Sequence, residues 1–195
     1  MKICFASILL VLFVSCHKRS ETTNSLNRIF WMEFDWVAND SAELTSLHVT
    51  SYLEFVDHKM ARIAKRASYD GPIIYKEINL PDSLKAEILD LLRMPLDSVY
   101  LFDIKNEGLK YCGPTFYLNY SILGKDSNRV LFIPPNAPEN LQKLEVKIQS
   151  LIDSPEGVNV KEFPIDSKFD EIIRDFGDSV KPPKIAPTKF IPPKI

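Results

Sequence analysis

The chain has 195 residues and a near-neutral charge, since 24 lysines and arginines stand against 26 aspartates and glutamates and the formal net charge is −2. This balance excludes the strongly basic surface that is typical of nucleic-acid binding, so we expect no nucleic-acid partner. A hydrophobic content of 45% with 26% charged residues is that of a globular domain, not of a disordered chain. Only six glycines are present, which argues against phosphate-binding and dinucleotide-binding loops.

The N-terminus has the parts of a secretory signal. Lys2 precedes an apolar run over residues 3–14, and the small Ser15 precedes Cys16. As a helix, residues 3–14 would rise only about 18 Å, which is less than the ~30 Å hydrocarbon core of a bilayer. We therefore expect residues 1–15 to be a signal peptide rather than a membrane-spanning helix.

The cluster Phe13-Val14-Ser15-Cys16 resembles the lipobox of bacterial lipoproteins. The resemblance implies cleavage after Ser15, a diacylglyceryl group on the Cys16 thiol and an acyl group on the new amine. Two acyl chains already suffice for stable anchoring. It also implies that the protein is held on a bacterial cell membrane or outer membrane, with its domain in the periplasm or outside the cell. Residues 16–25 would then be a tether, and residues 26–177 a single domain.

The first element of that domain is the aromatic stretch 27–37. Large apolar side chains alternate with a second set of side chains, which is typical of a strand. The first set is Phe30, Met32, Phe34 and Trp36, and the second is Trp31, Glu33 and Asp35. A helix that buries Leu26, Ile29, Phe30, Phe34 and Val37 also fits the stretch.

The middle of the chain has the pattern of a duplicated strand–strand–helix unit, over about 51–94 and 116–152. Residues 73–75 resemble 130–132, and residues 79–84 resemble 136–141, at one common offset of 57 residues. Residues 52–55 resemble 117–120 at an offset of 65. Each unit alone would leave an apolar face in water, so we expect the two units to share one sheet.

Both units end in a predicted amphipathic helix. Each helix opens with a proline and an acid, which suit the first turn. The apolar positions recur at helical spacing. They are Leu84, Ile88, Leu91 and Leu92 in the first helix, and Leu141, Leu144, Ile148, Leu151 and Ile152 in the second.

After a turn at 153–157, residues 158–163 suit a further strand. A capping-box pattern at Ser167 then precedes Phe169, Ile172, Ile173 and Phe176 at helical spacing, and Gly177 marks the expected end. Residues 178–195 form a Pro/Lys-rich extended tail. Its last 15 residues hold five prolines, four lysines and no acid, which excludes a regular helix.

Candidate chemical groups are scattered along the chain. His48, and His58 beside Asp57, lack the further ligands that a metal site needs. Cys112 is the only cysteine outside residues 1–16, and no histidine or predicted helix start lies beside it to activate the thiol. Asp97, Asp103 and Glu107 have no spacing that pairs two carboxylates in one cleft. We therefore assign no catalytic, cofactor-binding or metal-binding residue.

One further candidate is the aromatic run 30–36, which could form a sugar-binding or peptide-binding platform if one ring faced outward. Burial in the core is the more common role of such rings.

These observations predict an α+β domain with an antiparallel sheet and helices mainly on one face. Its expected function is that of a non-catalytic cell-envelope module that binds a protein or a cell-wall component. Two alternatives are an immunity-type protein that neutralises a toxin at the membrane and, ranked last, a hydrolase with a dispersed site.

The lipid anchor gives the first testable prediction. Because the Cys16 thiol is the expected acylation site, Cys16→Ala should abolish incorporation of radiolabelled fatty acid and leave an unprocessed or soluble product. Fractionation of cells that produce the two proteins checks this. Membrane retention of the variant, with no label in the wild type, would contradict the anchor.

Overall fold

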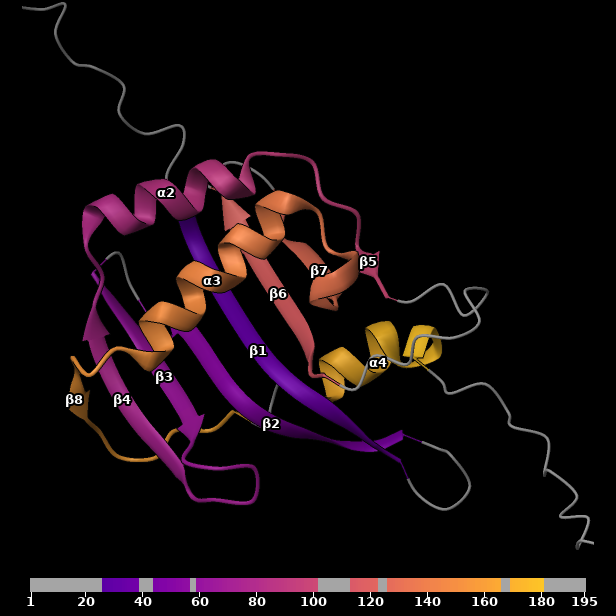
Figure 1. The fold of residues 1–195 in the computed structure, drawn as a ribbon, viewed down its shortest axis with the longest axis horizontal. Coiled ribbons are helices and arrows are strands. Elements are labelled where there is room, and N and C mark those ends of the chain that lie inside the picture. The colour runs from indigo at the N-terminus through magenta and orange to yellow at the C-terminus, as the bar shows by residue number, and fades with distance from the viewer. Residues whose placement is uncertain are drawn as a thin grey trace, which may run out of the picture.

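The computed structural model describes residues 26–38, 44–56, 59–101, 113–122, 126–165 and 169–180. This part of the chain forms one eight-stranded sheet in the order β5-β7-β6-β1-β2-β3-β4-β8, together with three α-helices (Figure 1). The strands are β1 Leu26–Ala38, β2 Leu44–Phe55, β3 Met60–Arg66, β4 Ile73–Asn79, β5 Val99–Tyr100, β6 Thr115–Ile122, β7 Asn128–Phe132 and β8 Val158–Asn159. The helices are α2 Asp82–Leu92, α3 Glu139–Asp153 and α4 Phe169–Val180. The predicted α+β class is confirmed, whereas the signal peptide, Cys16, the tether and residues 181–195 lie outside the described residues.

The sheet is mainly antiparallel, as predicted, and one strand pair makes it mixed. All its strand pairs are antiparallel except β5 and β7, which run in the same direction. The backbone N–H of Leu131 donates to the Ser98 carbonyl at 2.9 Å, and that of Ile133 donates to the Tyr100 carbonyl at 3.1 Å. A strand of two residues with this pairing leaves no periodic pattern in the sequence.

Strand β1 lies at the centre of the sheet, as the alternation over 27–37 predicts. It pairs with β2 on one side and with β6 on the other. Trp31 and Phe34 are both 0% exposed although they point to opposite faces. The helical alternative for this stretch is therefore wrong. Phe30, Trp31 and Phe34 are buried in the core, whereas Trp36 is only partly buried, so the aromatic platform stays a hypothesis for that ring alone.

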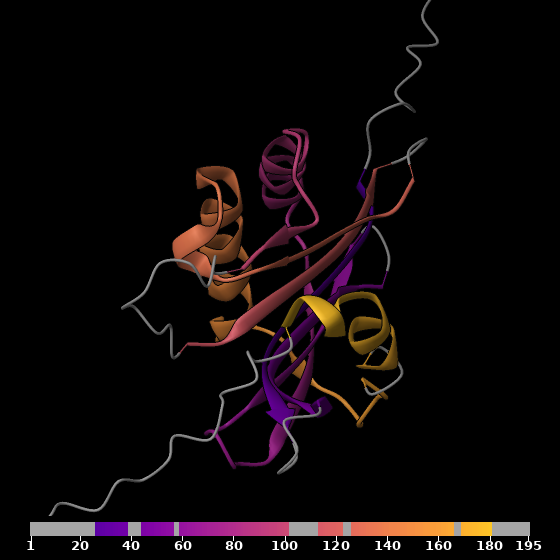
Figure 2. The same ribbon diagram turned by 90° about the vertical axis from the view of Figure 1, so that its right-hand side faces the viewer.

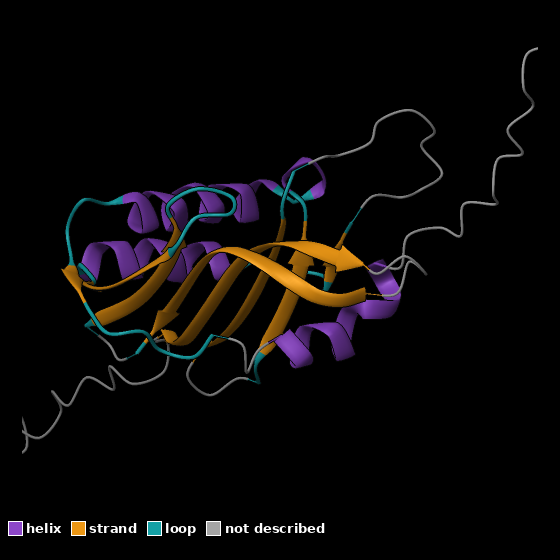
Figure 3. Cartoon of the chain, turned by 90° about the horizontal axis from the view of Figure 1, so that it is seen from below, coloured by secondary structure: helices purple, strands orange, loops and turns teal. Residues whose placement is uncertain are grey.

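Two hydrophobic cores cover the two faces of the sheet. The first lies beneath α2 and α3 and includes Trp31, Ile63 and Ile148. The second lies beneath α4 and includes Phe30, Phe34 and Phe176. Figures 2 and 3 show α2 and α3 together on one side and α4 on the other. The expectation of helices mainly on one face thus holds for two of the three described helices.

Helices α2 and α3 form where the periodicity places them. The α3 positions predicted to be buried, Leu141, Leu144, Ile148, Leu151 and Ile152, all lie in the first core. In α2, Ile88 and Leu92 are buried, whereas Leu84 and Leu91 are half-buried. Pro81 and Pro138 precede the first helical residues, in agreement with the pattern that proline and an acid form at a helix start.

The first predicted unit contains a strand that the sequence pattern did not indicate. Strand β3 lies between β2 and β4 and pairs with both, so residues 51–94 form three strands and a helix. The matched segments 73–75 and 130–132 also present different faces. Ile73 and Tyr75 contact the second core, whereas Val130 and Phe132 lie in the first. The duplication itself stays a prediction.

The C-terminal part differs from its prediction in two details. Only two residues of the predicted strand 158–163 pair with the sheet, as β8, after a turn in which Gly157 has φ +119°. A Cβ at Gly157 would lie 2.9 Å from the Glu77 carbonyl oxygen, so glycine is required there. Helix α4 continues through Gly177 to Val180. Gly177 is thus inside a helix rather than at its end, and the domain extends past residue 177.

Leu141 gives a prediction for the stability of this fold. Its side chain is 0% exposed at the start of α3, so Leu141→Ala should lower the free energy of unfolding by about 2–5 kcal/mol. Leu84→Ala, at the matching but half-buried position of α2, should lower the free energy of unfolding by clearly less. Urea denaturation of the two variants checks the order. Equal losses would mean that burial at these two positions does not set the stability.

Candidate functional site: a polar shelf on the sheet

The face of the sheet that carries α2 and α3 becomes polar on one side of α3, which crosses β1 (Figure 1). Along β1, Ile29 and Trp31 lie in the first core, and the next side chains on the same face are Glu33 and Asp35. Polar side chains of four other segments lie beside them. We call this surface the polar shelf, and its members are Glu33, Asp35, His48, Ser51, Lys65, Tyr69, Glu145, Gln149 and Asp153.

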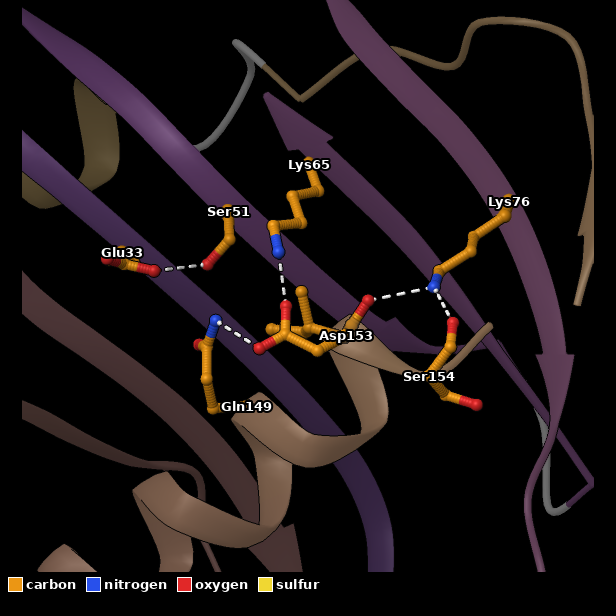
Figure 4. A network of polar contacts seen from close by, with 8 residues as sticks. Glu33, Ser51, Lys65, Lys76, Gln149, Asp153 and Ser154 are labelled. Carbon is orange, nitrogen blue, oxygen red and sulfur yellow. Dashed lines mark hydrogen bonds and ion pairs between the residues drawn. The ribbon is translucent and has the colours of Figure 1, made fainter. Parts of the chain in front are cut away.

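Glu33 is held in place by β2. The Ser51 hydroxyl donates to Glu33 Oε2 at 2.7 Å, and Ser51 itself is 1% exposed (Figure 4). A bulge accompanies this contact, because the pairing shifts between Glu33 and Phe34 and leaves Thr50 as the extra residue of β2. Thr50 Oγ1 donates to the Glu33 carbonyl at 3.2 Å. Bulges of this kind re-aim side chains, and here one fixes the Glu33 carboxylate at the edge of α3.

Two lysines bind the C-terminal end of α3. Lys76 donates to the backbone carbonyls of Ile152 at 2.8 Å and Ser154 at 2.6 Å, and Lys65 forms an ion pair with Asp153. The last carbonyls of a helix have no partner inside the helix and carry partial negative charge, so cations are favourable there. Burial, and then the charge of Lys65, lower the pKa of Lys76. Figure 4 shows both lysines reaching the helix end from β3 and β4.

Glu145 of α3 interacts electrostatically with Glu33 of β1. Burial raises the pKa of Glu145, and the neighbouring charge of Glu33 raises it further. A carboxylate near another negative charge is harder to ionise. Within the described residues, no lysine or arginine forms an ion pair with Glu33 or Glu145.

The far end of the shelf is aromatic. The His48 and Tyr69 rings are stacked at 4.3 Å between centroids, and His48 Nε2 lies 2.8 Å from the Tyr69 carbonyl oxygen. The charge of Asp35 is the main cause that raises the pKa of Tyr69. Arg66 fixes the turn that carries Tyr69 by donating to the carbonyls of Val49 and Gly71. Tyr69 nevertheless remains 58% exposed.

Of the candidate residues taken from the sequence, only His48 belongs to the shelf. Asp57, His58, Asp103, Glu107 and Cys112 lie outside the described residues. Asp97 lies at the opposite edge of the sheet, where its backbone N–H donates to the Tyr100 hydroxyl at 2.7 Å. Within the described ranges, no three His, Cys, Asp or Glu side chains are placed to hold a metal ion. The signal that sequence reasoning missed is the pair of acids at 33 and 35, on the same face as Trp31.

Two shallow hollows lie at the β4–β8 edge. One is lined by Met60, Ile78, Val158 and Val160, and the other by Leu84, Val146 and Lys147. Their linings are mainly apolar, and the Glu77 side chain in the first is paired with Arg62 at 2.9 Å. These hollows bring together fewer polar and charged side chains than the shelf does.

Comparison of the chain with family models, with curated protein sequences and with solved structures finds no match. None of the helices within the described ranges is both long enough and apolar enough to cross a bilayer.

The raised pKa of Glu145 predicts how the stability of the protein changes with pH. Because its pKa is raised in the folded state, its contribution to stability is present when it is protonated and is lost as the pH rises through the folded pKa. Relative to wild type, Glu145→Gln should therefore become more stable between about pH 4 and pH 7. Urea denaturation across this range measures the difference.

Glu139 on the same helix is the matched control. A hydrogen bond from Lys143 lowers the pKa of Glu139, so its contribution is present above the unfolded pKa and is lost as the pH falls. Glu139→Gln should thus become less stable than wild type as the pH rises. The same trend in both variants would contradict the raised pKa of Glu145.

Proposed function

We propose that this chain is a lipid-anchored cell-envelope protein whose folded domain is a non-catalytic interaction module, and that the polar shelf is the surface that binds a protein partner. The anchor is the lipid expected on Cys16. The partner's contact would be made on the face of the sheet beyond α3.

The openness of the shelf is the observation that carries this proposal. Tyr69 is 58% exposed, and the Lys65 and Asp153 side chains are 43% and 47% exposed. Small-molecule sites are usually enclosed and mainly apolar, whereas protein interfaces combine an aromatic centre with a wet, polar surround. A broad surface with one exposed aromatic stack and several charges fits the second class.

The contacts within the shelf favour binding over catalysis. Ser51 and Glu33 have the hydrogen bond of a nucleophile and its base. However, Ser51 is 1% exposed, so a substrate has no access to its hydroxyl. Lys65 is engaged by Asp153, and Lys76 by two carbonyls. These groups position the surface, and none of them is free to act as a base.

Anchoring supports the same proposal, because a tether raises the local concentration of a binding surface for partners at the membrane. The immunity-type alternative is one case of it, in which the partner is a toxin. Identification of the partner separates this case from the others.

Site-specific crosslinking tests the proposal. A photo-crosslinking amino acid at Val37 or Ser46, which pair at the exposed end of the shelf, should give a heavier, protease-sensitive species in intact cells. The control positions are Ser83 and Ala86 on the exposed side of α2, and they should give little. Equal yields from the two surfaces, or a product that resists protease, would contradict a protein partner at the shelf.

A further inference from the structure

We infer that the partner of the polar shelf is a basic protein surface that presents arginine side chains. This inference rests on the proposed function of the shelf and adds the chemistry of the partner. It follows from the charges of the shelf, from the contacts that Lys65 and Lys76 already make and from the exposed aromatic stack.

The shelf and its rim are acidic. Asp70, which follows Tyr69 in an exposed turn, adds to the four carboxylates of the shelf. The complete set is Glu33, Asp35, Asp70, Glu145 and Asp153. Lys65 is paired with Asp153, and Lys76 is bound by the carbonyls at the end of α3. The other four carboxylates therefore leave the field of the shelf negative, which attracts cationic partners and repels nucleic acid.

Glu33 is the most favourable position for a cation from a partner. The Ser51 hydroxyl holds one oxygen of its carboxylate at 2.7 Å, and within the described residues no lysine or arginine forms an ion pair with it. The charge of Glu145 on α3 adds to the negative field at this position. The described residues offer no third ligand that would make the position a metal site, and a guanidinium satisfies carboxylates without one because it presents five N–H donors in a planar fork.

The Tyr69 and His48 stack selects arginine over lysine. Tyr69 presents an exposed ring next to the Asp35 carboxylate. A guanidinium can stack on an aromatic face while it donates to a carboxylate in its own plane, whereas an ammonium is a compact and strongly hydrated charge. The shelf therefore offers two positions that suit a guanidinium, one at the carboxylates and one on the aromatic stack.

The C-terminal tail of the chain is a competing occupant. Its last 15 residues hold four lysines and no acid, so they match the charge of the shelf. They contain no arginine, so the chemistry of the aromatic stack favours a separate partner over this tail.

Peptide binding to the full-length lipoprotein in neutral detergent micelles tests the inference. Fluorescent hexa-arginine should bind more tightly than hexa-lysine, and the affinity of both should fall with salt. Glu33→Gln with Glu145→Gln should weaken hexa-arginine binding by about tenfold. The charge-matched control, Glu87→Gln with Asp90→Asn on α2, should leave it unchanged. Tyr69→Ala should remove the preference for arginine while it leaves hexa-lysine binding largely intact.

Several outcomes would overturn the inference. Equal losses in the shelf and α2 variants would mean that the peptide senses only net charge. Equal affinity for the two peptides would remove the role of the aromatic stack. Binding that is seen only after truncation following Val180 would make the tail the occupant. If crosslinks at Val37 and Ser46 persist while the peptide arm fails, only the chemistry of the partner is wrong. If both fail, the proposed function fails as well.

Discussion

Burial of β1 on both of its faces is the constraint on which the rest of the fold depends. Trp31 packs against Phe116 and Phe132 on one face, with centroids 5.4 Å and 5.6 Å away. Phe30 packs against Tyr52 and Tyr117 on the other, at 5.1 Å and 5.7 Å. A strand with large rings on both sides needs a covering layer on each side. Helices α2 and α3 supply one layer, and α4 supplies part of the other.

The shelf follows from the direction of α3. The 13 residues of β1 extend about 43 Å, and α3 crosses this strand rather than running along it (Figure 1). A helix about 10 Å wide therefore leaves part of the strand bare on its face. The exposed part carries Glu33 and Asp35, while Phe34 on the opposite face remains buried in the second core. The change from apolar to acidic side chains along one face of β1 lies beside α3, where Glu145 of the helix interacts with Glu33.

The parts of the fold that were predictable carry their signal within one segment. The alternation in β1 and the stripes of α2 and α3 are local patterns that burial then uses. Strand β3 was missed because Ala61, Arg62, Ala64, Lys65 and Arg66 have weak strand preference, and its place is set by pairing with β2 and β4. The shelf was missed for a related reason. Its acids and lysines come from segments far apart in the chain, and only the sheet register and the end of α3 bring them together.

The direction of β1 also sets how far the shelf stands from the anchor. Leu26 begins the strand, and Asp35 lies nine residues further along it, a distance of about 30 Å at 3.3 Å per residue. The segment that would carry the lipid joins the sheet at Leu26, at the end of β1 away from the acids. A domain held by that end would present its charged face to the aqueous space rather than to the lipid headgroups. A large folded partner could then bind without displacing the bilayer.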